Sequence, residues 1–490
     1  DSKTTFATAI TQAENGYVWV GDGTQEQPYQ CVLSEGTFYL ATDLALEAPS
    51  NTQFGSIQIM ENVTLCLNGH TITVKANREA FKITKSISTP SSTLTLTDCQ
   101  GGGQITHDPS FLGNGVNLSE NCNFIMYGGS ITGNTTTGGE NTTWRSGGVW
   151  VRDNSTFTMY GGSITDNTTV WNGGGVYVQD SGKFYMHGGE ISGNNASSNS
   201  GSSGGGVHIG SDSAFTMTGG TISGNSASNN GGGVHISSGN TFTMTGGSIT
   251  GNNAGTGGGV YVGSDVGYGN SILTLSGAVQ IKDNVCNGTK GSNGNCSGGT
   301  TSNIYLRSGK TITIGTNHLS SDASIGVTTQ NPPANEGIAI ATGANLDDKQ
   351  YFHSDTGENY LFYVTSDGTI CMTTANAHDH PICGASCQDG SSHTSETWQP
   401  IGSAEELTAI QNGGCYYLTD DVTLSSRSVW APPSDTFLCL NGHTITGAAG
   451  KDTIDVGSGV NFILTDCKGS GKITHESSDA VGCGVNVIGS

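Results

Sequence analysis

The stretch Phe157-Thr-Met-Tyr-Gly-Gly-Ser-Ile-Thr-Asp-Asn167, followed after a polar loop by Gly175-Val-Tyr-Val178, decides the fold because the chain repeats it. Five copies of this pattern begin at Phe124, Phe157, Phe184, Phe215 and Phe242. The first glycine of each Gly-Gly pair lies at position 128, 161, 188, 219 or 246, so the steps are 33, 27, 31 and 27 residues. A repeat of this length, made of short apolar-x-apolar segments separated by Gly and Asn, predicts a β-solenoid.

Each copy predicts three strands of about three residues. Alternation along the strands places the same kind of side chain on the inner side of every coil, in one coil Val176, Val178, Phe184, Met186 and Ile191. Strands this short bury their apolar side only by stacking in parallel on their counterparts one coil later, about 4.8 Å away. The expected fold class is therefore all-β, a parallel β-helix with three short strands per coil.

The corners of the coil are expected at the Gly-Gly and Gly-Asn positions, where a positive φ or a missing Cβ is required. The asparagine that ends each copy is expected to stack on its counterparts as an internal row of amides. We call this row the asparagine ladder: Asn134, Asn167, Asn194, Asn225 and Asn252.

Composition excludes several classes of partner. The chain has 490 residues, 77 of them Gly, with 33% hydrophobic and 12% charged residues, as suits a solenoid with a thin core. The net charge of −23 argues against nucleic acid and anionic membranes as partners. No stretch approaches the roughly 18 apolar residues of a membrane-spanning helix. The start at Asp1 and the stop at Ser490 within a repeat predict a trimmed piece of a longer protein.

Five segments are expected along the chain. They are an N-terminal segment or cap at 1–37, the parallel β-helix at 38–322, a small β cap at 323–375, a Cys/His linker at 376–402, and a capping helix with the first coils of a second β-helix at 403–490. The second β-helix is predicted because Leu438-Cys-Leu-Asn-Gly-His-Thr-Ile445 repeats residues 65–72 letter for letter. Ser403-Ala-Glu-Glu406 has the spacing of a capping box, and a short helix there would cover the open end of that solenoid.

Thirteen cysteines predict an oxidising compartment or a metal site. Four fall at the start of each solenoid: Cys31, Cys66, Cys99 and Cys122, then Cys415, Cys439, Cys467 and Cys483. Disulfides that join the first cysteine with the second and the third with the fourth are one expectation, and other pairings stay open. Cys286 and Cys296 flank a Gly/Asn loop that a disulfide between them would staple.

The linker has the ligand density of a zinc site, in His378, His380, Cys383 and Cys387. The alternative is a disulfide-stapled linker with solvated histidines, which we favour. Structural zinc, or calcium at turn aspartates, is the cofactor hypothesis, and no other cofactor is expected.

Candidate binding residues lie at one corner of the coil, where the distance from the ladder asparagine to the Val-x-Val strand varies between copies. The longest insertions there carry Trp144, Arg145 and Trp171. Beside that corner, the outward positions of the Val-x-Val strands form an aromatic column: Trp150, Tyr177, His208, His235 and Tyr261. The rings either stack on sugars or cover one another and the sheet, and we favour the second interpretation.

Catalysis of glycoside cleavage would need paired carboxylates or a carboxylate with a base. Asp166, Asp180 and Arg152 are weak candidates. Asp166 stands where other copies have Gly, and Asp180 is expected near Arg152 of the coil before it. A structural role in turns is the preferred interpretation of both aspartates.

The phrase Phe-Thr-Met-x-Gly-Gly-x-Ile-x-Gly-Asn with Gly-Gly-Val-Tyr-Val resembles the right-handed parallel β-helix repeats of bacterial surface proteins, in particular large secreted proteins of gut Firmicutes. Its Gly-Gly-x-Ile element is similar to repeats of polymorphic outer-membrane autotransporters. The resemblance covers residues 38–320 and 416–490, and implies an exported, surface-attached or filamentous adhesin or stalk. Pectate-lyase-like enzymes and polygalacturonases share the fold, but the chain lacks the Asn-Thr-Asp and Gly-His-Gly motifs of polygalacturonases.

The expected function is therefore that of an extracellular protein, secreted or attached to the cell surface, with a structural or adhesive role. Glycans or other host or cell-surface ligands are its expected partners, together with further copies of itself joined end to end into a fibre. The alternative is a carbohydrate-active enzyme, a polysaccharide lyase or glycoside hydrolase, that works on the loop edge. A carboxylate pair in a sugar-sized cleft would favour the enzyme.

Overall fold

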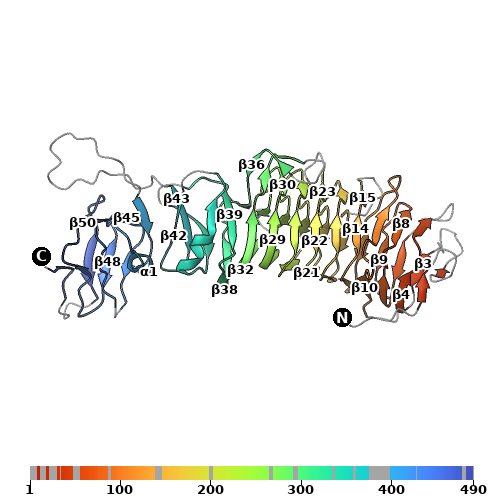
Figure 1. Cartoon of the computed structure of the whole chain (residues 1–490), viewed down its shortest axis with the longest axis horizontal. Helices are drawn as coiled ribbons and strands as arrows, with labels where there is room; N and C mark the ends of the chain where they lie inside the picture. The colour runs from red at the N-terminus through yellow and green to blue at the C-terminus, as the bar shows by residue number, and fades with distance from the viewer. Residues whose placement is uncertain are drawn as a thin grey trace. The chain divides into compact units, whose positions relative to one another are not determined.

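A computed structural model describes residues 8–10, 18–20, 30–33, 35–47, 56–86, 90–137, 146–197, 202–263, 269–290, 296–333, 337–356, 360–374, 398–425, 428–476 and 482–488. The protein is all-β and forms a parallel β-solenoid of about 13 turns, as the sequence predicts (Figure 1). Contacts divide it into a first unit of residues 1–310 and 320–330 and a second unit of residues 311–319 and 331–490. No helix in the described ranges is long and apolar enough to cross a membrane.

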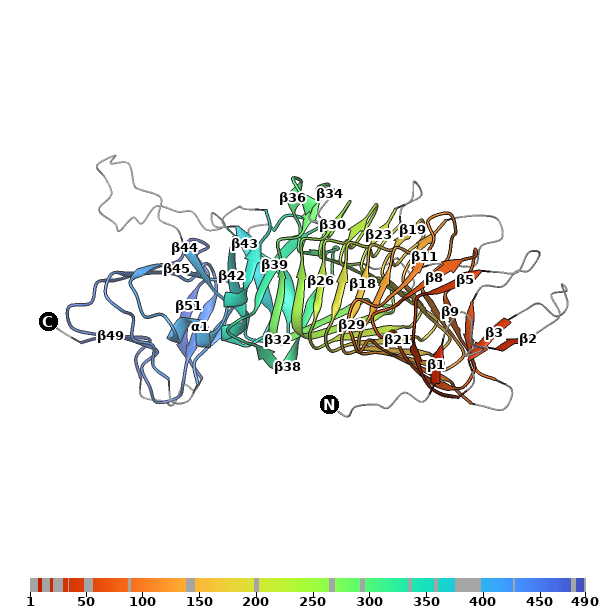
Figure 2. The same cartoon turned by 45° about the vertical axis from the view of Figure 1, so that its right-hand side comes forward.

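In the first unit, three series of strands stack in parallel and follow one another around each coil (Figure 2). The first series contains β1 (Thr8–Ile10), β4 (Gly36–Leu40), β7 (Asn62–Cys66), β10 (Thr93–Thr97), β13 (Asn123–Met126), β17 (Thr156–Met159), β21 (Lys183–Met186), β25 (Ala214–Met217), β29 (Thr241–Thr250) and β32 (Ile272–Lys282). The second contains β5 (Leu44–Glu47), β8 (Thr71–Lys75), β11 (Gln104–His107), β14 (Ser130–Thr132), β18 (Ser163–Thr165), β22 (Glu190–Ser192) and β26 (Thr221–Ser223), and continues in the later halves of β29 and β32.

The third series carries the Val-x-Val segments. It contains β3 (Gln30–Leu33), β6 (Ile57–Ile59), β9 (Phe81–Ile83), β12 (Val116–Leu118), β16 (Val149–Val151), β20 (Val176–Val178), β24 (Val207–Ile209), β28 (Val234–Ile236), β31 (Val260–Val262), β37 (Ile304–Leu306) and β39 (Ser324–Thr329). The antiparallel partner of β3 is β2 (Val18–Val20). Since β39 pairs in parallel with β37, the coils extend past residue 322, where the β cap was expected to begin.

A smaller sheet follows the asparagine ladder. It contains β15 (Thr135–Thr136), β19 (Thr168–Thr169), β23 (Asn195–Ala196), β27 (Ser226–Ala227), β30 (Asn253–Ala254), β33 (Val285–Cys286) and β36 (Thr300–Thr301). A hairpin of β34 (Thr289–Lys290) and β35 (Cys296–Ser297) leads from β33 to β36.

The inner side chains form the core, and this prediction is confirmed. The five residues named for one coil, from Val176 to Ile191, are each fully buried. The phenylalanines that begin the five copies stack with ring centroids 4.6–4.9 Å apart and planes within 12° of parallel. Glycine is required at the corners, because a Cβ at Gly206 would lie 2.7 Å from the carbonyl oxygen of Gly233.

The asparagines also stack. Both the backbone N–H and the side-chain Nδ2 of Asn194 donate to Oδ1 of Asn225, at 3.0 and 2.9 Å, and the same pair of bonds joins each ladder asparagine to the next. The ladder continues beyond Asn252 to Asn284 and Asn303, and it begins at His107, whose Nδ1 lies 2.7 Å from Oδ1 of Asn134. Every asparagine of the ladder is buried.

The second unit combines a region of parallel and antiparallel strand pairs with the second solenoid. Its first part contains β38 (Ile312–Leu319), β40 (Ile338–Thr342), the 3-10 helix η1 (Leu346–Tyr351), β41 (Phe352–Ser354), β42 (Tyr360–Val364) and β43 (Ile370–Thr374). Its second part contains β44 (Trp398–Ile401), α1 (Ala404–Thr408), β45 (Gly414–Leu418), β46 (Val422–Thr423), β47 (Thr436–Cys439), β48 (Thr444–Gly447), β49 (Ile454–Val456), β50 (Phe462–Thr465), β51 (Lys472–His475) and β52 (Val485–Val487). The helix predicted after Ser403 is present, with Ser403 as its N-cap.

The expected disulfides of Cys66 with Cys31 and of Cys99 with Cys122 are wrong. Cys66 is bonded to Cys99, with Cα atoms 6.4 Å apart. The reason is the register of the coils: Cys66 ends β7, and Cys99 lies just past the end of β10, the strand stacked on β7. Cys122 instead occupies a buried position next to Ser92, whose backbone N–H donates to its Sγ at 3.4 Å.

Candidate functional site

The aromatic column lies on neighbouring strands of the third series. The register aligns Trp150, Tyr177, His208, His235 and Tyr261, and adds Tyr305 of β37 as a sixth member. The residues on either side of each of these are buried in the core, so the strands fix the ring positions closely. Tyr305 was not among the predicted column residues, because its coil lacks the Gly-Gly phrase by which the five copies are recognised.

The rings of the column cover one another. The imidazoles of His208 and His235 stack with centroids 4.7 Å apart, and the rings of His235, Tyr261 and Tyr305 continue the stack at 5.2 and 5.6 Å. Tyr177 meets His208 edge-on. Since the ring faces within the stack are turned toward each other, their polar edges rather than their faces are left for a ligand.

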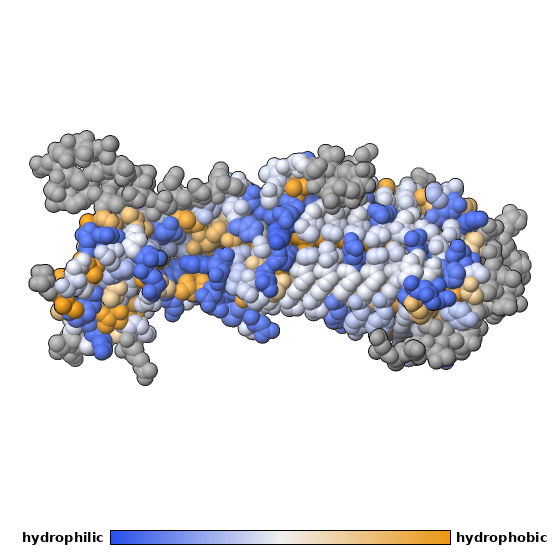
Figure 3. Space-filling view, in the orientation of Figure 1, coloured by the Kyte–Doolittle hydropathy of each residue, from blue (hydrophilic) through white to orange (hydrophobic). Residues whose placement is uncertain are grey.

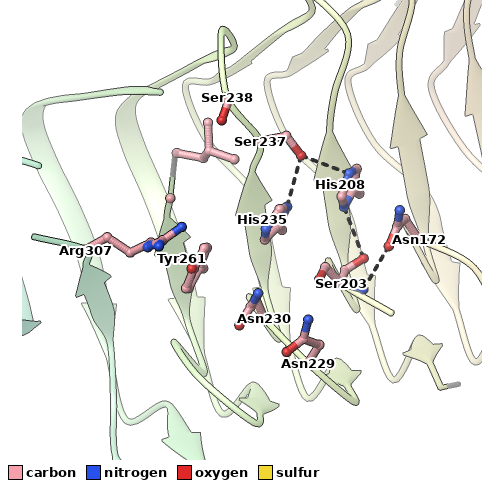
Figure 4. Close-up of a pocket in the computed structure, with 12 residues that line it drawn as sticks. Asn172, Ser203, His208, Asn229, Asn230, His235, Ser237, Ser238, Tyr261 and Arg307 are labelled. Atoms are coloured by element: carbon pink, nitrogen blue, oxygen red, sulfur yellow. Dashed lines mark hydrogen bonds between the residues drawn. The ribbon is translucent and has the colours of Figure 1, made fainter. Parts of the chain in front are cut away.

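A groove of about 340 Å³ lies along the middle of the column (Figure 4). Its lining comes from the variable corner, the column and the turns after the Val-x-Val strands: Asn172, Ser203, His208, Asn229, Asn230, His235, Ile236, Ser237, Ser238, Tyr261, Gly263 and Arg307. We call this feature the imidazole groove. Among the described residues that line it there is no Asp or Glu.

Hydrogen bonds across the groove fix the protons of both histidines. Nδ1 of His208 lies 3.3 Å from the carbonyl oxygen of Ser203, which only accepts, so this nitrogen carries the proton. Nε2 of His208 then accepts from the hydroxyl of Ser237 at 3.2 Å, and Nδ1 of His235 donates to that hydroxyl at 3.3 Å. Figure 4 shows the Ser237 hydroxyl joined to both rings. The chain of bonds leaves Nε2 of His235 as a hydrogen-bond acceptor.

Both imidazoles are neutral at neutral pH. Burial lowers the pKa of His208 to about 4, against the opposing effect of the bond to the Ser203 carbonyl. Burial also holds the pKa of His235 well below its ordinary value, and the neighbouring His208 adds to this effect. Each ring therefore offers one donor and one acceptor, as the bonds to Ser237 require.

This arrangement predicts a loss of stability in mild acid. Below the ordinary histidine pKa of about 6.5 the unfolded chain binds protons that the folded groove does not, so the free energy of unfolding falls as pH falls toward 4. The expected slope is about 1.4 kcal/mol per pH unit for each of the two histidines. Urea unfolding between pH 7 and pH 4.5 measures it. The variant His208→Asn/His235→Asn should have a shallower slope, whereas His187→Asn, at an exposed position, should keep the wild-type slope. Equal slopes in all three proteins would contradict the prediction.

No known protein family, curated protein or solved structure matches this chain.

No hydrogen bond or ion pair of the described residues joins two of the catalytic candidates, although Asp180 lies in the turn one coil after that of Arg152, as expected. Arg152 bonds to its neighbour Asp153 at 2.9 Å and lies over the Trp150 ring, whereas Asp180 accepts from Gln179 at 2.6 Å. Asp166 has a φ of 54°, the left-handed conformation that Gly has at the same position in other copies. Asp tolerates this conformation better than most residues, which accounts for its presence in the turn.

The remaining candidates lie elsewhere. Trp171 is 37% exposed at the variable corner, next to the groove residue Asn172. Trp144 and Arg145, the linker residues His378, His380, Cys383 and Cys387, and the side chains of Cys31 and Cys296 lie outside the described residues. Within the described ranges, no three His, Cys, Asp or Glu side chains are placed to hold a metal ion.

The sequence interpretation missed a second, more exposed aromatic row. Tyr127, Tyr160 and His187 follow the buried methionine of three successive copies and stack at 4.9 Å. Tyr127 is 54% and Tyr160 48% exposed. Comparing the residue after Met in each copy would have found them. In the last two copies threonine takes this place, and Nδ1 of His187 lies 2.8 Å from Oγ1 of Thr218.

Proposed function

We propose that this protein is an extracellular structural or adhesive surface protein whose first solenoid binds glycans in the imidazole groove. The observation that carries the proposal is the groove itself, about 340 Å³ in volume, which is within the range of about 300–1,000 Å³ typical of ligand sites. Stacked strands hold its floor, so the polar groups are positioned before a ligand arrives. A disulfide such as Cys66–Cys99 supports an oxidising compartment.

The chemistry of the lining suits a ligand rich in hydroxyl groups. Hydroxyl, amide and imidazole groups from Ser237, Asn229, Asn230 and His235 alternate donors with acceptors over a short distance. A sugar hydroxyl both donates and accepts, so it can donate to Nε2 of His235 while it accepts from a neighbouring amide. Recognition would therefore depend on hydrogen bonds, because the column's rings stack on one another.

The same lining favours binding over cleavage. Glycoside hydrolysis in most families uses two carboxylates about 5–10 Å apart, and none lines the groove in the described part of the chain. A histidine with a pKa of about 4 is a weak base at neutral pH. The alternative of a carbohydrate-active enzyme on the loop edge, with Asp166 and Asp180, has no geometric support of this kind.

A glycan array probed with the full chain, followed by calorimetric titration of each hit, tests the proposal. We expect retention of intact glycans, and a loss of affinity of about tenfold or more in His235→Ala and in Asn229→Ala/Asn230→Ala, since each removes at least one hydrogen bond to the ligand. His187→Ala is the matched control, because this histidine is exposed and is not among the groove residues.

Two results would overturn the proposal. Unchanged affinity in both groove variants would place the ligand elsewhere, with the row of Tyr127 and Tyr160 as the next surface to alter. Release of shortened products from an intact polysaccharide would establish the enzyme alternative, which Asp166→Asn and Asp180→Asn would then locate.

A further inference from the structure

The two cysteines of the disulfide-bonded first solenoid have close counterparts in the second. Cys66 ends β7, and its register partner in β10 is Thr97. Cys99 comes two residues after Thr97. Cys439 likewise ends β47, and its register partner in β50 is Thr465. Cys467 comes two residues after Thr465. In both pairs the backbone N–H of the second cysteine points to the sulfur of the first, at 3.1 Å in the first pair and 3.5 Å in the second.

The turns that hold these cysteines are also built alike. The carboxylate of Asp98, next to Cys99, accepts from two glycine N–H groups at 2.7 Å each, and that of Asp466, next to Cys467, does so at 2.7 and 2.6 Å. Asn68 and Asn441 have left-handed φ values of 53° and 50°. Their side chains donate to the carbonyl oxygen of the preceding coil, at 3.1 and 2.9 Å.

We propose that Cys439 and Cys467 form a disulfide that clasps two coils of the second solenoid, as Cys66 and Cys99 do in the first. A disulfide needs particular Cα and Cβ positions, and although the structure records Cys439 and Cys467 as thiols, their register, turns and backbone contact match those of the bonded pair Cys66–Cys99. This inference goes beyond the proposed function and does not depend on a glycan.

The bond forms by exchange with a small disulfide such as oxidised glutathione. The thiolate of Cys467, which is exposed, attacks one sulfur of the oxidant, forms a mixed disulfide and releases one glutathione thiolate. The thiolate of Cys439 then attacks the Cys467 sulfur and releases the second, so two protein thiols are oxidised while one disulfide is reduced to two thiols. Burial raises the pKa of Cys439 to about 12, with Cys467 as a smaller cause, which makes Cys439 the slower nucleophile and the second to react.

The order-based pairings, Cys415 with Cys439 and Cys467 with Cys483, are less compatible with the coil. Cys483 precedes the strand Val485–Val487, whereas Cys122 follows the matching strand Val116–Leu118. The fourth cysteine of each set therefore occupies a different place in its coil. Cys415 pairs in register with Phe437, and Cys439 lies two residues further on within the extended strand β47, not past its end as Cys99 and Cys467 do. Two residues of extended strand and one strand spacing separate the Cα atoms of Cys415 and Cys439 by about 8 Å, which is too far for a disulfide.

Peptide mapping of the full chain tests the proposal. The protein is equilibrated in a glutathione redox buffer, alkylated and digested with trypsin without reduction. Cleavage after every Lys and Arg places Cys439 and Cys467 in separate peptides, residues 428–451 and 452–468, and neither holds another cysteine. We expect these two peptides to be recovered as one linked species that reduction splits.

Any other linkage overturns the proposal. A link from 428–451 to the peptide 350–427, which holds Cys415 and three other cysteines, would give Cys439 another partner, and a link from 452–468 to 473–490 would show the pairing of Cys467 with Cys483. Alkylation of both cysteines in protein whose Cys66–Cys99 bond is intact would show that no clasp forms. As a second measurement, Cys439→Ala/Cys467→Ala should lower Tm by about 5 °C under oxidising conditions, and reductant should then cause no further loss in the second unit. An unchanged Tm would also count against the clasp.

Discussion

Replacement of Asn194 by alanine is expected to lower the free energy of unfolding by about 4 kcal/mol, because two buried donors lose their acceptor. These donors are the backbone N–H and the Nδ2 of Asn167, which lie 3.0 and 2.9 Å from Oδ1 of Asn194. The substitution also removes the bond from Nδ2 of Asn194 to the carbonyl oxygen of Ile164 at 2.8 Å. Water cannot replace these partners, since the site is fully buried. The midpoint and slope of urea unfolding measure the loss.

Two further variants isolate the cause. Asn194→Asp keeps the shape and the acceptor but replaces the donor by an oxygen that faces Ile164 and Asn225, so a comparable loss is expected. Asn270→Ala, at an exposed asparagine that accepts a bond from Lys310, should change stability by about 0.5 kcal/mol or less. A loss below about 1 kcal/mol in Asn194→Ala would show that the ladder contributes little to stability.

The ladder belongs to the part of the structure that the sequence predicts well. Inner positions such as Phe184 and Ile191 recur at fixed places in each copy, and parallel stacking brings identical residues into register. The inner positions assigned in one coil therefore also apply to the coil that follows it. The extension to Asn284 and Asn303 was missed because those coils lack the Gly-Gly phrase, although stacking needs only the asparagine.

The orientation of the rings could not be predicted in the same way. An outward position in a strand says that His208 and His235 leave the core, but not whether their rings lie face to face. That choice depends on side-chain torsions set by neighbours such as Ser203, from a loop of variable length, and Ser237, from the turn after β28. Because the shape of the imidazole groove depends on these loop and turn residues, the sequence predicted only the corner of the coil where the groove lies, and not the groove itself.

The cysteine pairing failed for a different reason. It was assigned by order along the chain, whereas a solenoid brings together residues one coil apart. Aligning Leu94-Thr-Leu-Thr97 with the strand that ends at Cys66 would have placed Cys99 beside it. For Asp166, in contrast, the copies were compared with one another, and Gly at the same position in other copies already indicated a left-handed turn.

The second large effect is expected at Glu406, in the second unit. Its side chain is 1% exposed, and its carboxylate accepts from the backbone N–H groups of Val364 and Gly402, each at 2.8 Å, and from the ammonium of Lys349. The capping box predicted at Ser403 is therefore formed only in part. The Ser403 hydroxyl accepts from the N–H of Glu406, but the Glu406 carboxylate accepts from the N–H of Gly402, the residue before the N-cap. One buried carboxylate thus joins α1 to β42 and to η1.

Glu406→Ala is expected to lower the free energy of unfolding of the second unit by about 4 kcal/mol, since two buried N–H groups and an ammonium lose their acceptor. Lys349→Met should cost less, about 1–2 kcal/mol, because Lys349 is 30% exposed and the two backbone bonds to the carboxylate remain. Glu405→Ala is the matched control on the same helix, where the side chain is exposed and little change is expected.

Hydrogen exchange gives the most direct measurement, because the amide of Val364 bonds to Glu406 itself. Its protection should fall in Glu406→Ala by a factor that matches the loss of stability, and should be unchanged in Glu405→Ala. If Val364 stays protected while the unit is destabilised, the loss arises within α1 rather than at its junction with β42. If neither quantity changes, the carboxylate does not hold the helix, and packing of Leu407 against the core of the second solenoid does so instead.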